Sequence, residues 1–196
     1  MIEFVRVLNN DIERDVRESA LFASRKDYIK KSMSKKEWFN YLIKEHSVIE
    51  TILIKIRFCN IKKDVASHLV RHTKNHPRYF MQTSRPDIVK KERDPDELIG
   101  LEIVLNPLAL INMARQRLCF NSQEATRKEM IGLKNYLLGE TDAFLNTLGF
   151  VLVPDCVYRG AFCSQRDLGL AKCCYNTVNT FGVVSERYAI FAGRFN

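Results

Sequence analysis

The sequence predicts an α/β protein in which a central, mostly antiparallel sheet is flanked by helices. Three observations lead to this prediction. Apolar and polar residues alternate over residues 2–8, and more regularly over 51–59, as they do in half-buried strands. Residues 11–24 carry apolar side chains at the spacing of an amphipathic helix. Ser34 followed by Glu37 forms a capping box, which marks the start of a further helix.

The helix that begins after Ser34 is expected to cover residues 35–46, with Trp38 on its apolar face. After the strand at 51–59, Asp64 can cap a helix over residues 64–74 that ends before Pro77. Two segments follow along the chain: residues 78–84, a strand or an extended loop, and residues 86–97, a polar connection.

The second half of the chain reads mainly as helix. Pro107 stands at a favoured first-turn position, so a helix should start there. Asn121 and Glu124 resemble a second capping box, whose helix should reach about Leu138. The other expected elements are a strand or helix approach over 98–105, a short helix over 141–148 and a mostly irregular tail from residue 151.

The length of 196 residues suits one domain, or one protomer whose core a partner completes. We expect residues 1–150 to form that domain and the cysteine-rich residues 151–196 to pack on it. No apolar run is long enough for a membrane span, and the N-terminus does not resemble a signal peptide. The expected location is therefore cytoplasmic, with no membrane partner.

The net charge of +8 favours anionic partners such as nucleotides and other phosphates. The lysines occur as scattered pairs, and no basic stripe interleaved with aromatic residues is visible along the chain. This pattern argues against a nucleic-acid partner. Solvated charged faces explain most of these lysines equally well.

The segment from Ser67 to His72 offers the first candidate site. On a continuous helix His68 and His72 share one face, and His76 continues that spacing. A metal site is one interpretation, although that face has no carboxylate and the H-E-x-x-H motif is absent. Ordinary surface or core histidines are a second. The third is an anion site, because Arg71 and His72 can both donate hydrogen bonds to a phosphate.

The helix that starts at Pro107 offers the second candidate site. Asn106 and Asn112 are unusual among its apolar residues, because a buried amide needs hydrogen-bonding partners. Such an amide matches the donor and acceptor edge of a flavin or a pyrimidine. Arg117 returns to nearly the same helical face as Asn106 and can polarise a carbonyl. Composition alone favours an ordinary helix with Asn112 exposed.

Residues 106–127 resemble the segment N-x-R-x-L-x-N-F-x-x-L-R-x-C-x-x-A-Q-x-E-I-R of the flavin-dependent thymidylate synthases. Arg71-His72 is similar to the start of that family's R-H-R signature. His46-Ser47 is similar to its H-x-[ST] element, and residues 82–85 are similar to its Q-S-x-R end. The first three elements occur in the family's order and cover residues 40–130, so together they are fairly specific.

This resemblance implies a homotetramer whose active sites lie between subunits. It implies that FAD carries a hydride from NADPH, and that methylenetetrahydrofolate supplies a carbon to C5 of dUMP without a cysteine nucleophile. Arg117 would be catalytic, polarising the pyrimidine. The implied flavin contacts are His46, Ser47, Arg71, His72, Asn106 and Asn112. The implied nucleotide contacts are His68, Arg71, Gln82, Thr83, Ser84, Arg85 and Arg117.

Several positions depart from the family pattern. Thr73 replaces the last signature Arg, Met81 stands where a Ser is usual, and Leu108 stands where an Arg approaches the flavin. The connection from Arg85 to Asn106 is shorter than the family's. Two alternatives therefore stay open: hydroxymethylation or a related C5 modification of dUMP or dCMP, and a non-catalytic nucleotide-binding homologue.

The tail carries four cysteines that could hold zinc or an iron–sulfur cluster. Their spacing contains no C-x-x-C pair, so reduced structural thiols are the favoured interpretation. Cys119, near Arg117, is expected to be a small buried apolar residue rather than a nucleophile. The four tail cysteines are Cys156, Cys163, Cys173 and Cys174.

Overall fold

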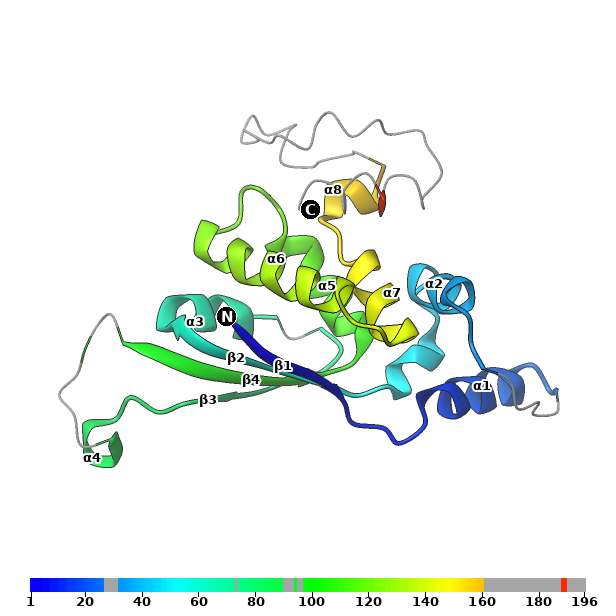
Figure 1. Ribbon diagram of the computed structural model, residues 1–196, viewed down its shortest axis with the longest axis horizontal. Helices are drawn as coiled ribbons and strands as arrows, with labels where there is room; N and C mark the ends of the chain where they lie inside the picture. Colours follow the sequence, from blue (N-terminus) through cyan, green and yellow to red (C-terminus); the bar gives the residue numbers. More distant parts are fainter. Residues whose placement is uncertain (27–31, 73, 90–93, 95–96, 161–187, 190–196) are drawn as a thin grey trace. The chain divides into compact units, whose positions relative to one another are not determined.

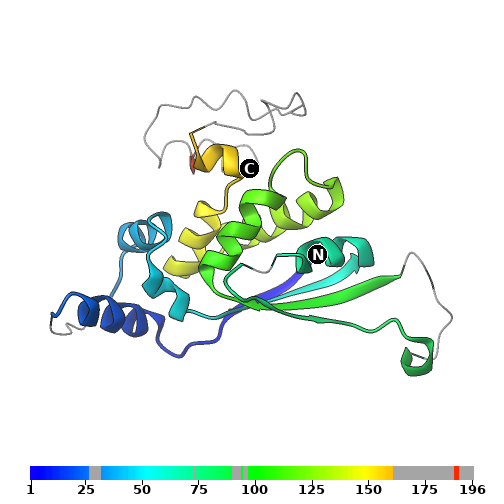
Figure 2. The same cartoon turned by 180° about the vertical axis from the view of Figure 1, so that it is seen from behind.

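The computed structural model describes residues 1–26, 32–72, 74–89, 94, 97–160 and 188–189. It confirms a mixed α/β chain with one antiparallel sheet (Figures 1 and 2). Two compact units divide the chain, Met1–Ala109 and Leu110–Asn196. The predicted cysteine-rich tail lies mostly outside the described residues.

The sheet belongs to the first unit and has the strand order β1-β2-β4-β3, with every neighbouring pair antiparallel. Its strands are β1 (Ile2–Val7), β2 (Ile54–Lys62), β3 (Arg78–Met81) and β4 (Leu98–Leu105). The alternating pattern at 2–8 marks β1, whereas the strand predicted over 51–59 begins and ends three residues later than predicted, because residue 51 still belongs to a 3-10 helix. Residues 98–105 form a strand, and residues 78–81 form another.

One face of this sheet supplies much of the first unit's core. Burial alternates along the whole of β4, and along β2 from Ile54 to Cys59, because successive side chains point to opposite faces. Ile56, Phe58 and Ile103 are fully buried. The β2–β4 register shifts between Phe58 and Ile61, where Asn60 has φ 52. Asparagine tolerates this left-handed conformation better than most residues, which makes the irregularity possible here.

The first two helices follow the sequence signals. In α1 (Ile12–Ala23) the Asp11 side chain accepts a hydrogen bond from the Arg14 backbone, and in α2 (Lys35–Ile43) both hydrogen bonds of the predicted capping box form. α2 ends three residues earlier than predicted. A 3-10 helix, η1 (Ser47–Thr51), follows it. Figure 1 shows α1 and α2 beyond the end of the sheet where β1 finishes.

The predicted helix over 64–74 is shorter than expected. α3 spans Lys63–Val70 and follows directly from β2, so Asp64 lies in its first turn and is not its cap. Beyond it, Asn75 and His76 have φ 60 and 53 and precede Pro77. α3 has already ended at Val70, with Arg71 as its C-cap, so His72 and His76 lie outside it. The prediction that His68, His72 and His76 share a helical face is therefore wrong.

The segment predicted as a polar connection is partly helical. α4 (Pro86–Val89) is a single helical turn, separated from β3 by residues 82–85. Residues 90–93, 95 and 96 of that connection lie outside the described residues.

Helices dominate the described part of the second unit. α5 (Pro107–Arg117) starts at the predicted proline, at the end of the first unit, and continues into the second. α6 (Glu124–Leu138), α7 (Ala143–Val151) and α8 (Asp155–Tyr158) follow. The Asn121 capping box is wrong: the residue before α6 is Gln123, and it gives no side-chain cap.

α6 and α7 pack closely as a helical hairpin. A Cβ added at Gly149 would lie 2.7 Å from the Leu137 Cβ atom, so only glycine allows this approach. Lys134 in α6 is fully buried, and its ammonium donates to the carbonyls of Gly149 and Leu152 at 2.8 and 2.9 Å. It thereby satisfies carbonyls that the carboxyl end of α7 leaves unpaired.

Candidate functional site

His46 lies at the junction between α2 and η1. Its Nδ1 accepts a hydrogen bond from the Val48 backbone at 3.4 Å, and its ring meets the Tyr41 ring edge-on, with centroids 5.7 Å apart. Ser47 is the first residue of η1, and both His46 and Ser47 are exposed. The local fold therefore holds the imidazole in place while leaving it accessible.

Beside His46, a pocket of about 410 Å³ opens between the last turns of α1 and α2. Its lining brings the imidazole together with three cations, and it holds no carboxylate among the described residues. Of the three, Lys44 is the C-cap residue of α2, where a cation complements the helix dipole. The lining residues are Arg17, Ala20, Leu21, Ser24, Lys26, Asn40, Tyr41, Lys44 and His46.

Arg17 is the most buried cation in that lining. Its Nη2 donates to the Glu37 carboxylate at 3.2 Å and to the Ser32 carbonyl at 3.3 Å. Hydrogen bonds from Ser34 and the nearby Arg17 hold the pKa of Glu37 below its usual range, so the pair stays charged. The Arg17 Nε is buried and makes no hydrogen bond to a described atom. Buried donors of this kind are usually completed by an ordered water or a ligand.

The Arg71-His72 signature lies at the carboxyl end of α3. His68 is half-buried on the helix, Arg71 is exposed at its cap, and the His72 backbone donates to the Leu69 carbonyl at 3.3 Å. The Tyr79 hydroxyl, from β3, donates to the His72 carbonyl. β3 thus fixes the backbone of this signature, while the Arg71 side chain stays open to solvent.

The predicted phosphate-binding residues 82–85 follow β3. Gln82 is fixed to β4, because its backbone and its side-chain oxygen both hydrogen-bond to Gly100, at 3.0 and 2.7 Å. The Ser84 hydroxyl accepts from Lys63 Nζ at 2.8 Å, which ties this segment to the start of α3. Arg85 pairs with Asp87, and the Thr83 hydroxyl accepts from the Arg85 backbone.

Asn106 has a structural role that the sequence interpretation missed. It is 8% exposed, and its Oδ1 accepts a hydrogen bond from the Ala109 backbone at 2.9 Å, across the first turn of α5. Asparagine followed by proline is a common helix start, so this signal was present in the sequence. The Asn106 oxygen is therefore already engaged, which leaves the amide nitrogen as its means of binding a ligand.

Asn112 and Arg117 belong to the second unit, whereas the other site residues predicted from the resemblance belong to the first. The Asn112 oxygen accepts from Arg115 Nη1 at 3.3 Å, and Arg115 stacks on Tyr158 with its Cζ atom 3.6 Å from the ring centroid. Arg117 is half-buried, and its carbonyl accepts from the Ser122 hydroxyl at 2.9 Å. Both predicted residues thus lie on one stretch of α5.

Of the four tail cysteines, only Cys156 lies among the described residues, where it is half-buried in α8. Cys163, Cys173 and Cys174 lie outside them. Cys119 is a half-buried free thiol, less buried than the sequence interpretation expected. Within the described ranges, no group of three or more His, Cys, Asp or Glu side chains is arranged to hold a metal.

The pocket cations Arg17, Lys26 and Lys44 are the residues that the sequence interpretation did not identify. Periodicity located both helices, but no local pattern encodes that the two helices line the same pocket.

Among the described residues, no helix combines the length and apolar character that crossing a membrane requires. No protein-family model matches this chain, and neither does any curated protein.

Proposed function

We propose that this chain binds a flavin dinucleotide and a pyrimidine deoxynucleotide, as a divergent relative of the flavin-dependent thymidylate synthases. The observation that carries this proposal is the position of His46. The resemblance assigns this residue to the flavin, and it lies in a pocket with three cations and no described carboxylate. Such a lining suits the diphosphate of a dinucleotide.

The pocket fits the phosphate end of that ligand better than its ring. Its volume of about 410 Å³ lies in the range of ligand sites but is small for a whole flavin dinucleotide. Lys26 and Lys44 would neutralise the phosphates, and the Arg17 guanidinium has hydrogen-bonding capacity left to complete. The exposed Ser47 hydroxyl and the His46 ring would border the next part of the ligand.

The nucleotide would be bound by the residues after β3 and by the end of α3. Lys63, beside Ser84, and the exposed Arg71 offer positive charge for a phosphate, and Arg85 offers more if it leaves Asp87. Arg117 would polarise the pyrimidine carbonyl as charge develops on the ring. The bound flavin would supply the hydride that the carbon unit needs. The family's homotetramer, with sites between subunits, is part of this proposal.

Two observations favour the non-catalytic alternative. Leu108, which replaces an arginine that approaches the flavin in the family, is 7% exposed in α5. Met81, which replaces the usual serine, is 44% exposed at the end of β3. Neither side chain can donate a hydrogen bond, so binding without turnover is the second candidate function.

Titrating the full chain with FAD and with riboflavin, followed by flavin fluorescence, tests the proposed pocket. Riboflavin lacks phosphate. The Lys44→Ala variant should therefore bind FAD about tenfold more weakly and bind riboflavin as the wild type does. Lys36→Ala, an exposed lysine of α2 outside the lining, is the matched control. Equal FAD affinity in Lys44→Ala and Lys36→Ala would refute the phosphate assignment.

Product analysis then separates the candidate activities. The protein is incubated with NADPH, labelled methylenetetrahydrofolate and either dUMP or dCMP. Labelled thymidylate supports the methyl transfer, whereas a hydroxymethyl product supports the related C5 modification. Nucleotide-dependent thermal stabilisation without NADPH oxidation supports the non-catalytic alternative.

A further inference from the structure

The sheet face opposite the core gathers cationic and aromatic side chains from three strands. The strand registers place these residues on one surface, which we call the polar sheet face. Phe80 is 57% exposed, an uncommon exposure for an aromatic side chain. The polar sheet face comprises Phe4, Arg6, Lys55, Arg57, Arg78, Phe80, Gly100, Glu102 and, between Lys55 and Arg78, Val104.

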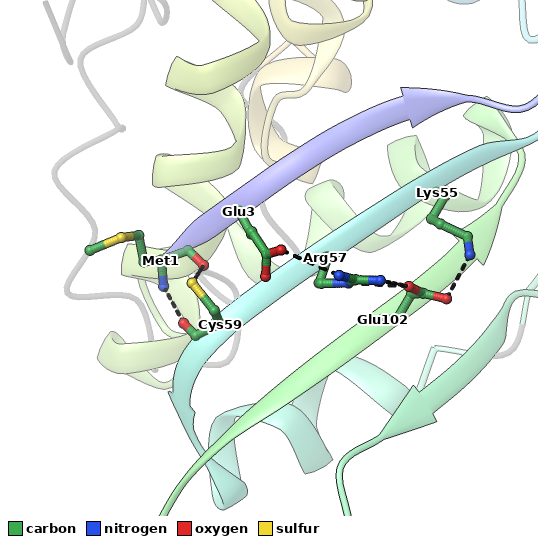
Figure 3. A network of polar contacts seen from close by, with 6 residues as sticks. All are labelled: Met1, Glu3, Lys55, Arg57, Cys59 and Glu102. Carbon is green, nitrogen blue, oxygen red and sulfur yellow. Dashed lines mark hydrogen bonds and ion pairs between the residues drawn. The ribbon is translucent and has the colours of Figure 1, made fainter.

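The charged side chains of this face form a connected chain of ion pairs (Figure 3). Glu102 of β4 accepts from Lys55 at 2.8 Å and from Arg57 at 2.9 Å, and these contacts hold the pKa of Glu102 below its usual range. Arg57 also pairs with Glu3 at 3.3 Å, and its Cζ atom lies 4.7 Å from the Phe4 ring centroid. The charges on this surface are thus connected to one another and lie beside the Phe4 ring.

A hollow of about 400 Å³ lies beside Phe80 on this face. Gly100 forms part of its lining, and Gln82 and Glu102 supply polar groups at its border. A planar base can stack on Phe80 there, and its amino or imino hydrogens can donate to the Glu102 carboxylate.

The charge of this face favours a polyanion. It carries Arg6, Lys55, Arg57 and Arg78 against the carboxylates of Glu3 and Glu102. A second copy of this chain would bring the same positive excess to the contact. A nucleic-acid strand would instead neutralise it and release counterions.

We propose that the polar sheet face binds single-stranded nucleic acid, with a base stacked on Phe80 and phosphates near Arg6 and Arg78. Single strands expose base faces to such platforms, whereas duplexes do not. The proposal goes beyond the flavin and nucleotide function and uses none of the residues that line the α1–α2 pocket. A basic and aromatic stripe is invisible along the chain because separate strands contribute its parts.

Fluorescence anisotropy with a labelled oligothymidylate, and with a duplex of equal length, tests this proposal across a series of salt concentrations. The single strand should bind more tightly, and its affinity should fall as salt rises. Phe80→Ala should weaken binding at least about fivefold. Arg78→Ala should reduce the slope of log affinity against log salt by about 0.7.

Phe22→Ala and Lys36→Ala are the matched controls, because both side chains are exposed and lie away from the sheet. Both variants should bind the oligonucleotide as the wild type does. Lys44→Ala should do so too, which would show that oligonucleotide binding does not depend on the flavin pocket. Three outcomes would overturn the proposal: no binding by the wild type, equal losses in Phe22→Ala and Phe80→Ala, or a dimer that Phe80→Ala dissociates without changing oligonucleotide affinity.

Discussion

Arg17 in α1 and Lys134 in α6 are both largely buried cations, but their surroundings differ. The Lys134 ammonium donates to three backbone carbonyls and is fully buried. The Arg17 side chain is 17% exposed, lines a pocket and has a buried Nε without a hydrogen bond to a described atom. The hydrogen bonds of Lys134 are completed within the fold, whereas those of Arg17 are not, which makes Arg17 the better candidate to contact a ligand.

The largest effect is expected from Lys134→Ala. It removes a buried aliphatic stem and leaves the carbonyls at the end of α7 without their donor, so the free energy of unfolding should fall by about 3 kcal/mol. Lys128→Ala is the control on the same helix, because Lys128 is exposed and pairs with Glu124 in a surface contact. It should change stability by less than about 0.5 kcal/mol. Similar denaturant midpoints for the two variants would contradict a structural role for Lys134.

The stability of the second unit should depend on pH through the same residue. Burial lowers the pKa of Lys134 from 10.5 to about 7. Between these values the unfolded chain binds more protons than the folded chain, so stability should rise with pH, by at most about 1.4 kcal/mol per pH unit. Denaturation at several pH values above 7 measures this slope. Lys134→Met should flatten it, and an unchanged slope in that variant would show that other groups cause it.

Gly149→Ala tests the close approach of the same hairpin. The new Cβ would lie 2.7 Å from the Leu137 Cβ atom and 2.8 Å from the Leu138 backbone nitrogen, so stability should fall by about 2 kcal/mol. Gly132→Ala in α6 is the control, because no heavy atom lies within 4 Å of its added Cβ. That variant should be stabilised by up to about 1 kcal/mol. Thermal unfolding of the two variants should therefore shift in opposite directions.

The smallest stability effect is expected from Arg17→Met. Loss of the Glu37 contact is offset by removal of an unsatisfied buried donor, so the unfolding free energy should change by less than about 1 kcal/mol. Its affinity for FAD should nevertheless fall markedly. A large loss of stability with normal FAD binding would show that Arg17, like Lys134, has a structural role and does not contact FAD.

The sequence predicted the elements whose signals are local. Alternation along β2 and the capping box of α2 identified both correctly, because burial on one face and caps leave marks within a few residues. The end of α3 was missed because the prediction took Pro77 as the stop, whereas the helix ends at Val70 with Arg71 as its C-cap. The pattern of apolar residues does not mark that earlier end.

The candidate site was predictable only in part. Asn106 was noticed as a buried amide, but its hydrogen bond to Ala109 shows that a helix cap explains part of that pattern. The pocket around Arg17 and the polar sheet face were missed for one reason. Each is built from segments far apart in the sequence, so neither leaves a local motif.

The absorption spectrum of the purified full chain tests the central claim most directly. The account predicts a flavin band, either as isolated or after addition of FAD, with the flavin released when the protein is denatured. A colourless protein that binds no added FAD, with or without pyrimidine deoxynucleotide, would contradict it.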